Sequence, residues 1–222
     1  MHTPHLPLLC IEDLHHSFEL SDQEHLELFH GISLKLYEGE SVAITGASGE
    51  GKSTLLHILG GLESPTQGFQ LWKGEKKLPK REEIGFIFQN FHLLEDLSVL
   101  ENILLPIRVQ KRKLTPKDFD AGLTLLKQVG LNERHKQLCA QLSGGEKQRC
   151  AIARAAITQP KLILADEPTG NLDHQTALQV SQLLFDMIKQ LGSTLLLVTH
   201  DKNLASCCQR VLHLENGVLE EV

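Results

Sequence analysis

Residues 46–54 read Gly-Ala-Ser-Gly-Glu-Gly-Lys-Ser-Thr, directly after an apolar run that predicts a buried strand over Ser41–Thr45. The spacing fits G-x-x-x-x-G-K-[ST]. In that pattern the glycines let the backbone wrap around a phosphate chain and point N–H groups inward. A helix predicted over about Lys52–Leu59 adds its positive N-terminal end. A chance glycine-rich loop would not lie between such a strand and such a helix. The stretch therefore predicts an α/β fold with a triphosphate site.

The rest of the chain alternates between apolar strand-like runs and helical stretches, which favours a mostly parallel sheet with helices on both faces. Residues 91–159 are mainly helical and read as an inserted subdomain within a single domain of residues 1–222, whose core covers about 1–90 and 160–222. The predicted strands are Leu8–Leu14, Ile32–Leu36, Phe69–Trp72, Ile84–Phe88, Leu162–Ala165, Thr194–Val198, Val211–Leu214 and Val218–Glu220. The predicted helices are Val99–Ile107, Pro116–Val129, Gly145–Ile157, Gln175–Gln190 and a short one after Asp201. We expect a polar loop over Ser21–Glu27, and we expect the region around Pro106 to end the first of these helices at about Ile107.

Two consecutive carboxylates, Asp166 and Glu167, follow the predicted strand Leu162–Ala165. Successive side chains of a strand point to opposite sides, so the two acids should have different roles. Asp166 is placed to hold magnesium, together with the Ser53 hydroxyl, and Glu167 to orient or deprotonate an attacking water. A solvated acid pair at a strand end is common, but it is a poorer explanation downstream of a phosphate loop.

Composition excludes several other classes of protein. The chain has 28 acidic and 22 basic residues and a net charge of -6, which argues against a dedicated nucleic-acid binder. No apolar run approaches the roughly 20 residues that span a bilayer. Met1–Leu9 lacks a basic-then-apolar signal pattern, so we expect the chain to stay in the cytosol. The loop over 74–83 carries several basic residues, which are compatible with a contact to lipid headgroups, but we favour a solvated turn.

The cysteines and histidines do not form a convincing metal or disulfide pattern. There are five cysteines and no C-x-x-C, so we expect idle or buried thiols. Twelve histidines are scattered along the chain, and the pairs at 15–16 and at 25 and 30 lack a supporting ligand set.

The string Leu-Ser-Gly-Gly-Glu-Lys-Gln-Arg at 142–149 resembles the L-S-G-G-Q signature of ABC-type ATPases, with glutamate where glutamine is commoner. Other landmarks of that family occur in order, and the resemblance covers about Leu8 to Leu219. It implies catalytic roles for Glu167, His200 and Gln89, a D-loop at Asp173, and magnesium at Ser53, Gln89 and Asp166. It further implies ATP contacts at Phe18, Gly46, Ala47, Ser48, Gly49, Glu50, Gly51, Lys52, Ser53 and Thr54. The signature residues Ser143, Gly144, Gly145 and Glu146 would bind ATP held by a second copy.

The same resemblance implies a P-loop NTPase (RecA-like) core with an N-terminal antiparallel β-subdomain and an inserted helical subdomain. It implies ATP and Mg²⁺ as cofactors and a head-to-tail homodimer that closes on two ATP molecules. The strings over 55–62 and 85–89 are similar to those of the lipoprotein-releasing ATPases, the LolD family. The partners implied are two integral membrane subunits of the LolC/LolE kind, at the cytoplasmic face of the bacterial inner membrane, with no nucleic acid.

Other functions stay open at this point. A macrolide or peptide exporter, or a cell-division complex, would use the same ATPase, because the membrane partner selects the cargo. Non-transport ABC proteins that act on nucleic acid need a long coiled coil or two nucleotide domains. Only about 90 residues separate Lys52 from Ser143, without a sustained heptad. A non-catalytic subunit would lack the complete set of Lys52, Gln89, Asp166, Glu167 and His200.

Glu50 departs from the family pattern, which has a small residue at this place in the phosphate loop. Its carboxylate would repel a triphosphate and weaken binding modestly, unless the side chain turns out to solvent. The ATP affinity of Glu50→Ser separates the two possibilities.

Overall fold

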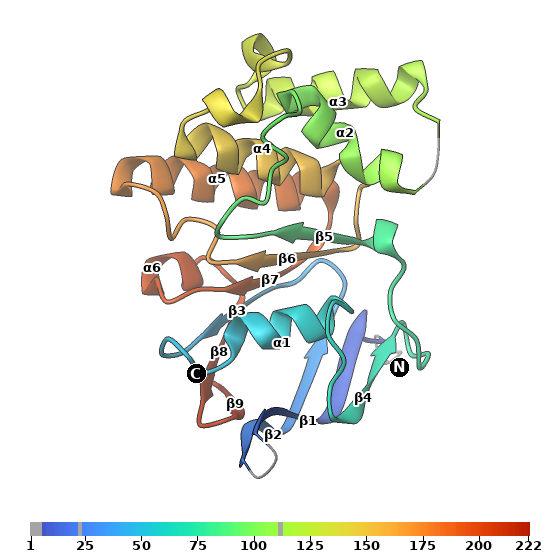
Figure 1. The fold of residues 1–222 in the computed structure, drawn as a ribbon. Coiled ribbons are helices and arrows are strands. Elements are labelled where there is room, and N and C mark those ends of the chain that lie inside the picture. The colour runs from blue at the N-terminus through green and yellow to red at the C-terminus, as the bar shows by residue number, and fades with distance from the viewer. Residues whose placement is uncertain (1–5, 22–23, 111–112) are drawn as a thin grey trace, which may run out of the picture. The chain divides into compact units, whose positions relative to one another are not determined.

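The computed structural model describes residues 6–21, 24–110 and 113–222. The chain divides into two compact units, Met1–Lys80 with Thr194–Val222, and Arg81–Ser193 (Figure 1). The first five residues of the N-terminal segment that we examined for a signal pattern lie outside the described residues, as do residues 22–23 of the expected polar loop. The subdomain limits expected from sequence stay a prediction, and the two units are described separately below.

The first unit contains an antiparallel sheet in the order β2-β1-β4, formed by β1 (Leu9–Ser21), β2 (Glu24–Leu36) and β4 (Gln67–Trp72). Our prediction of a polar loop over Ser21–Glu27 is wrong for the described residues, because β1 extends to Ser21 and β2 begins at Glu24. A polar sequence alone therefore does not distinguish a loop from the ends of two paired strands. The sheet buries Phe29 and Trp72 completely.

The same unit contains β3 (Ser41–Thr45) with parallel neighbours β7 (Thr194–Val198) and β8 (Arg210–Glu215), and β9 (Val218–Glu221) pairs antiparallel with β8. Every residue of β7 is buried, as expected for a central parallel strand covered on both faces. The helix α1 (Lys52–Leu59) contacts β7, and the short helix α6 (Lys202–Ala205) contacts β3. Ile44 pairs with Val198, so the loops that follow β3 and β7 leave the sheet at one edge.

The second unit combines the parallel strands β5 (Ile84–Ile87) and β6 (Leu162–Asp166) with four longer helices. Helix α4 contacts α2, α3, α5 and strand β5, and it is therefore the centre of this unit. The helices are α2 (Val99–Val109), α3 (Pro116–Gln128), α4 (Gly144–Ala156) and α5 (His174–Leu191), and the 3₁₀ turns are Arg81–Glu83, Asn132–Arg134 and Cys139–Gln141.

Local sequence explains most helix boundaries. Helices α2 and α4 begin with capping boxes, Ser98 with Glu101 and Ser143 with Glu146. The helix α5 ends at Gly192, whose φ of 63° places it in the left-handed region. Our prediction that Pro106 ends its helix is wrong, because α2 continues to Val109. The proline removes one backbone donor, but burial of the apolar face of α2 outweighs that loss.

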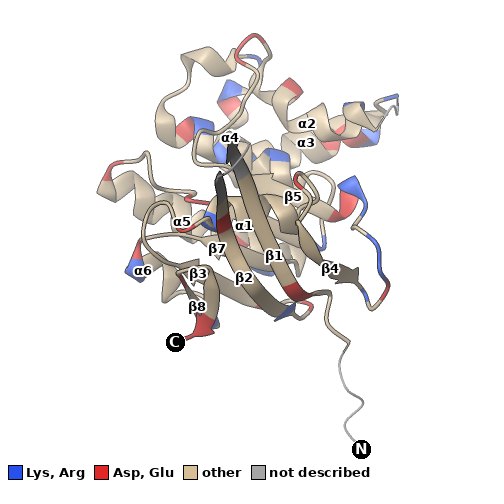
Figure 2. Cartoon of the chain, turned by 60° about the horizontal axis from the view of Figure 1, so that its bottom comes forward, with Lys and Arg blue, Asp and Glu red and all other residues tan. Residues whose placement is uncertain are grey.

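Charged side chains of both signs and unpaired cysteines characterise the described residues. In the view of Figure 2, acidic and basic residues are interspersed along the elements. In the lysine-containing loop, Lys77 Nζ lies 2.8 Å from Glu75 Oε2 and Lys76 lies over the Phe69 ring, which fits a locally paired turn. All five cysteines are free thiols. Within the described residues, the helices are too short or too polar to cross a bilayer, and no cluster of three or more candidate metal ligands occurs.

Candidate functional site

The phosphate loop connects β3 to α1, and its glycines are required by close contacts. A Cβ on Gly46 would lie 2.4 Å from the carbonyl oxygen of Leu214, and a Cβ on Gly51 would lie 2.7 Å from Cδ2 of Leu28. Gly51 also has a φ of 90°, a backbone conformation that residues other than glycine adopt only with strain. The loop backbone is therefore packed against β8 and β2, which hold its shape.

Helix α1 presents its N-terminal end to this loop without a side-chain cap. Gly51 at the N-cap position supplies no side-chain hydrogen bond, and the first turn contains no acidic residue. The first N–H groups of a helix lack partners within the helix, and they carry a partial positive charge. Ser53 is exposed and Thr54 half-buried in the same turn. The arrangement suits an anion with several oxygen atoms.

Lys52 is the cation of this loop. Its side chain is buried, and Nζ donates to the carbonyl oxygens of Gly46 at 3.1 Å and of Ala47 at 2.6 Å. The ammonium group therefore lies over the concave backbone of the loop, where a phosphate oxygen would compete for it.

Glu50 is directed away from the concave side of the loop. Its Oε2 accepts a hydrogen bond of 2.8 Å from the backbone N–H of Asn216, in the turn between β8 and β9. The carboxylate is thus occupied by a contact that anchors the loop to this turn. The geometry favours the second of the two possibilities considered above, a side chain turned outward.

We therefore predict that Glu50→Ser changes the affinity for ATP by less than about twofold, and that it lowers the free energy of unfolding by about 0.5–1 kcal/mol, because an exposed hydrogen bond to a carboxylate is lost. Nucleotide titration and chemical denaturation measure the two effects. ATP binding that is clearly tighter in the variant would restore the repulsion hypothesis.

His200 lies at the same edge of the sheet as the phosphate loop. It follows β7, and the backbone N–H of the preceding Thr199 donates to the carbonyl oxygen of Ile44 at 3.1 Å. His200 and Gly46 line one pocket of about 500 Å³, together with Thr45, Lys202, Ala205, Ser206, Val211, His213 and Val222. The structure therefore brings together these two residues, which the sequence separates widely.

Phe18 lies on β1, where it pairs with Leu26 of β2. Its side chain is 38% exposed, and its ring contacts the ring of His16 edge-on at 4.8 Å. Gly51 of the phosphate loop packs against Leu28 of β2, the strand that pairs with β1 at Phe18. Strand β2 therefore connects the phosphate loop to this aromatic side chain. An exposed ring at such a place can stack on a planar base.

In the second unit, Gln89 and Glu167 come together at the carboxyl ends of β5 and β6. The Gln89 side-chain amide donates to Asn171 Oδ1 at 3.2 Å, and Asn171 Nδ2 donates to the Gln89 carbonyl oxygen at 3.0 Å. A Cβ on Gly170 would lie 3.0 Å from Gln89 Nε2 and 3.5 Å from the Cβ of Glu167. The glycine thus allows both side chains to occupy one small region.

The two predicted carboxylates differ in backbone conformation. Asp166 is the last residue of β6, whereas Glu167 has a φ of 42° and leaves the strand direction. A left-handed conformation is strained for glutamate, and such strain recurs at functional sites. The backbone N–H of Gly170 donates to the Glu167 carbonyl oxygen at 3.0 Å and helps to hold this turn.

The signature residues form the N-terminal end of α4. Ser143 and Gly144 are exposed, and Ser143 caps the helix by accepting from the Glu146 backbone N–H. Gly145 is buried, and a Cβ there would lie 2.4 Å from Thr176 Cγ2 of α5. The glycines thus allow α4 to begin in close contact with α5.

Asp173, the predicted D-loop residue, is the N-cap of α5. Its Oδ1 accepts from the backbone N–H of Thr176 at 3.1 Å, and hydrogen bonds from Thr176 lower the pKa of the carboxyl group. Thr176 also faces Gly145. Signature and D-loop residues therefore meet where α4 and α5 begin.

Glu146 completes the cap, because its Oε2 accepts from both the backbone N–H and the hydroxyl of Ser143 at 2.9 Å. These hydrogen bonds, with Arg134 Nε at 3.3 Å from Oε1, lower the pKa of Glu146 from its ordinary 4.5. A lowered pKa means that the ionised carboxylate stabilises the fold above the unfolded-state pKa. This stabilisation is lost as the pH falls through the folded-state value.

We predict that Glu146→Gln is less stable than the wild type at pH 7 by up to about 1 kcal/mol, since glutamine keeps the cap but loses the charge. The difference should begin to shrink as the pH falls below the ordinary 4.5 of this carboxyl group, and should disappear once the pH is below its lowered pKa in the folded state. Urea unfolding of both proteins at neutral and at acidic pH measures it. A difference that persists unchanged in acid would show that the charge of Glu146 is not its cause.

Some contacts at the site had no signal in the sequence. The hydrogen bond between Gln89 and Asn171 joins residues that are 82 positions apart, and the one between Glu50 and Asn216 joins residues that are 166 positions apart. The close approach of the Leu214 carbonyl oxygen to Gly46 is a third case, because a contact made by a backbone oxygen does not depend on the type of residue.

The sequence profile of the family described as "ABC transporter" matches residues 29–170. The chain belongs to the ABC transporter family. A LolD protein of Protochlamydia amoebophila, described as the ATP-binding protein of a lipoprotein-releasing system, is 45% identical over 227 aligned positions, which cover 99% of each chain. The LolD protein of Shewanella denitrificans is 44% identical over 204 residues, which cover 88% of this chain and 87% of the relative.

Solved ABC cassettes have the same fold. A dimeric, post-hydrolysis state of the ATP-binding cassette MJ0796 with ADP and phosphate superposes with a TM-score of 0.85 at 34% identity, covering 96% of this chain and 98% of that one. The structure of CbiO1 from Clostridium perfringens superposes with a TM-score of 0.81 at 29% identity. The alignment covers 96% of this chain and 86% of CbiO1. The predicted P-loop NTPase fold class is confirmed, and the chain is an ABC-type ATPase that binds ATP.

Proposed function

We propose that this ABC ATPase drives the release of lipoproteins from the bacterial inner membrane. The observation that carries the proposal is the 45% identity to a LolD protein over 99% of both chains. The strings over 55–62 and 85–89, which led us to the LolD family from sequence alone, lie at the phosphate loop helix and at β5. Both elements border residues that we assign to the nucleotide.

In this function, the first unit holds the triphosphate. Lys52 and the backbone N–H groups of the phosphate loop bind the β- and γ-phosphates, assisted by the positive end of α1. Phe18 stacks on the adenine ring, and His200 donates to the γ-phosphate or to the attacking water. The pocket that His200 shares with Gly46 supports this role.

The second unit supplies the reacting groups. Glu167 accepts a proton from the attacking water, and Gln89 orients that water from the neighbouring strand end. Ser53, Asp166 and Gln89 offer hard oxygen ligands of the kind that Mg²⁺ prefers, and such sites use one or two carboxylates with the phosphates themselves. A bound Mg²⁺ ion would neutralise negative charge on the phosphates.

A second copy of the chain completes each site. Ser143 and the N–H groups of Gly144 and Gly145 form an exposed helix N-terminus, suited to the γ-phosphate held by a partner. ATP then favours the closed dimer because it contacts both copies, and hydrolysis removes that preference. The dimeric assemblies of the MJ0796 cassette support this arrangement.

We further propose two integral membrane subunits of the LolC/LolE kind as partners, and a peripheral location at the cytoplasmic face of the inner membrane. The test is to purify the chain with the membrane proteins that accompany it, and to reconstitute the complex in liposomes that contain an acylated lipoprotein. We expect ATP-dependent transfer of the lipoprotein to a soluble carrier. Transfer of a macrolide or peptide instead would contradict the proposal and indicate a related exporter.

A further inference from the structure

Arg154 lies in the last turn of α4 and reaches back to the segment that follows Gln89. Its Nη2 donates to the carbonyl oxygen of Phe91 at 2.7 Å, and its Nη1 donates to the carbonyl oxygen of His92. Burial lowers the pKa of this guanidinium from its ordinary value. The group nevertheless stays charged at neutral pH, as arginine does in proteins. Two consecutive carbonyl groups are therefore held by one half-buried cation.

The backbone that Arg154 holds is strained. Phe91 has a φ of 58° and His92 a φ of 46°, so two consecutive residues with side chains occupy the left-handed region. Such residues persist only where surrounding contacts hold them. The ring of His92 meets the ring of Phe88 edge-on at 4.7 Å, which adds one such contact. The two hydrogen bonds from Arg154 hold the carbonyl groups of this segment, while the backbone N–H groups of Phe91 and His92 donate to the carbonyl oxygens of Phe88 and Asn90.

The strained residues determine where Gln89 lies. Asn171 holds the backbone and the side chain of Gln89, and Arg154 holds the backbone two and three residues further on. The segment 89–92 is thus fixed at both ends. Loss of the second attachment would let Phe91 and His92 relax toward ordinary φ values, which shifts or loosens Gln89.

We propose that Arg154 is a positioning residue for ATP hydrolysis, which fixes the backbone of residues 91 and 92 and thereby the side-chain amide of Gln89. This inference rests on the role proposed for Gln89. It also joins two parts of the machinery, because the helix that ends near Arg154 begins at the signature residue Ser143. A 13-residue helix is a rigid element of roughly 20 Å, so its reorientation would move the Gln89 segment as well.

The first test compares Arg154→Ala and Arg154→Lys with the control Arg108→Ala. Arg108 is an exposed arginine of α2 whose Nη1 lies 3.9 Å from Oε1 of Glu101. We expect kcat to fall about 10- to 100-fold in Arg154→Ala and less in Arg154→Lys, while KM for ATP changes less than about threefold, because misplacing a reacting group affects mainly the chemical step. Arg108→Ala should behave like the wild type.

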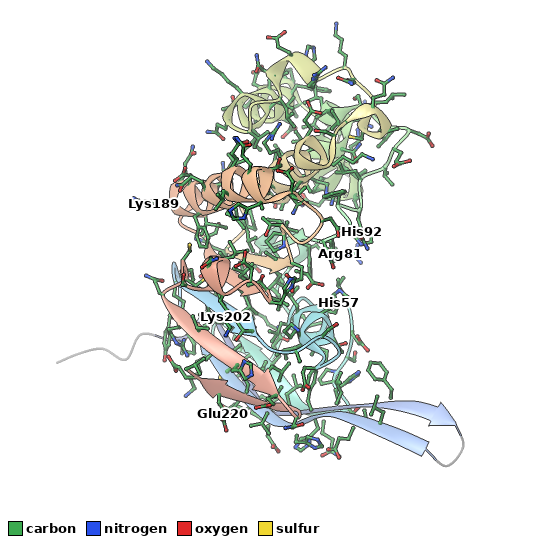
Figure 3. The ribbon with its side chains drawn as sticks, turned by 90° about the vertical axis from the view of Figure 1, so that its left-hand side faces the viewer. His57, Arg81, His92, Lys189, Lys202 and Glu220 are labelled. Atoms are coloured by element: carbon green, nitrogen blue, oxygen red, sulfur yellow. The ribbon has the colours of Figure 1, made fainter. Side chains whose placement is uncertain are left out.

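Chemical rescue separates positioning from a general loss of structure. Arg154 lines a cavity of about 280 Å³ with Arg81 and His92, both labelled in Figure 3, so removal of its side chain leaves room for a small guanidinium ion. Methylguanidinium at low millimolar concentration should restore part of the kcat of Arg154→Ala, and should leave Arg108→Ala and the wild type unchanged. A merely destabilised protein would gain nothing from this ion.

Glycine at the strained position gives a second, independent rescue. Because glycine adopts positive φ without strain, Arg154→Ala combined with Phe91→Gly should recover kcat a few-fold over Arg154→Ala alone. Amide hydrogen exchange of residues 89–92 without nucleotide should be faster in Arg154→Ala, and slower again in the double variant. If Arg154→Ala does not fold, the same comparisons are made with Arg154→Lys.

The outcomes distinguish this inference from the proposed role of Gln89. A Gln89→Ala variant with wild-type kcat removes the role of Gln89, whatever Arg154 does to hydrogen exchange. If Gln89→Ala is impaired but the Arg154 variants keep wild-type exchange at 89–92, the inference is overturned. It is also overturned if their kcat falls and neither methylguanidinium nor Phe91→Gly restores any of it.

Discussion

Glu167→Gln should abolish ATP turnover while it leaves ATP binding intact. Glutamine has nearly the same shape as glutamate but cannot accept the proton of the attacking water. General-base catalysis contributes about 10²- to 10⁴-fold, so kcat should fall by at least about 100-fold. The strained backbone at this position, with a φ of 42°, is retained because both side chains have the same backbone restrictions.

The variant should also accumulate as an ATP-bound dimer, because the nucleotide that favours the closed pair is no longer consumed. Phosphate release measures turnover, and size-exclusion chromatography with ATP and Mg²⁺ measures the dimer. Glu133→Gln is a matched control, since Glu133 is an exposed carboxylate in the 3₁₀ turn Asn132–Arg134. Phosphate release at the wild-type rate by Glu167→Gln would assign the base to another residue.

Elements with a strong local signal could be predicted from the sequence. The strand Thr194–Val198 and the start of α3 at Pro116 agree with the structure at the residue level. Burial of an entire apolar run explains the first, and proline in the first turn explains the second. Our prediction made β1 and β2 too short, because sequence polarity alone does not distinguish polar strand ends from a loop.

In the candidate site too, features with a strong local signal could be predicted from the sequence, and features that depend on distant residues could not. The position of the phosphate loop before α1 and that of Asp166 and Glu167 at the end of β6 could be predicted, because both motifs consist of neighbouring residues. The contacts that orient the site could not, since they join distant residues or involve backbone atoms. The left-handed conformations of Glu167 and Phe91 are the clearest case, because nothing in these two residue types favours a positive φ. Tertiary contacts impose it, as the Arg154 bonds illustrate.

Lys52→Met should remove most of the affinity for ATP without unfolding the protein. Methionine fills nearly the same volume along the side chain, so the packing at the start of α1 is retained. What is lost is the ammonium group, whose Nζ lies 3.1 Å from the Gly46 carbonyl oxygen and 2.6 Å from that of Ala47. A charge-assisted hydrogen bond contributes about 1.5–3 kcal/mol, so we expect Kd to rise about 10- to 100-fold.

Thermal unfolding with and without nucleotide distinguishes lost binding from lost structure. A ligand that binds only the folded state raises Tm according to its concentration relative to Kd. The wild type and the control Lys35→Met, an exposed lysine of β2, should both be stabilised by ATP. Lys52→Met should melt near the wild-type Tm without ATP, and should gain little on its addition. An ATP-induced shift of wild-type size would mean that the loop amides and the α1 N-terminus hold the triphosphate without this cation.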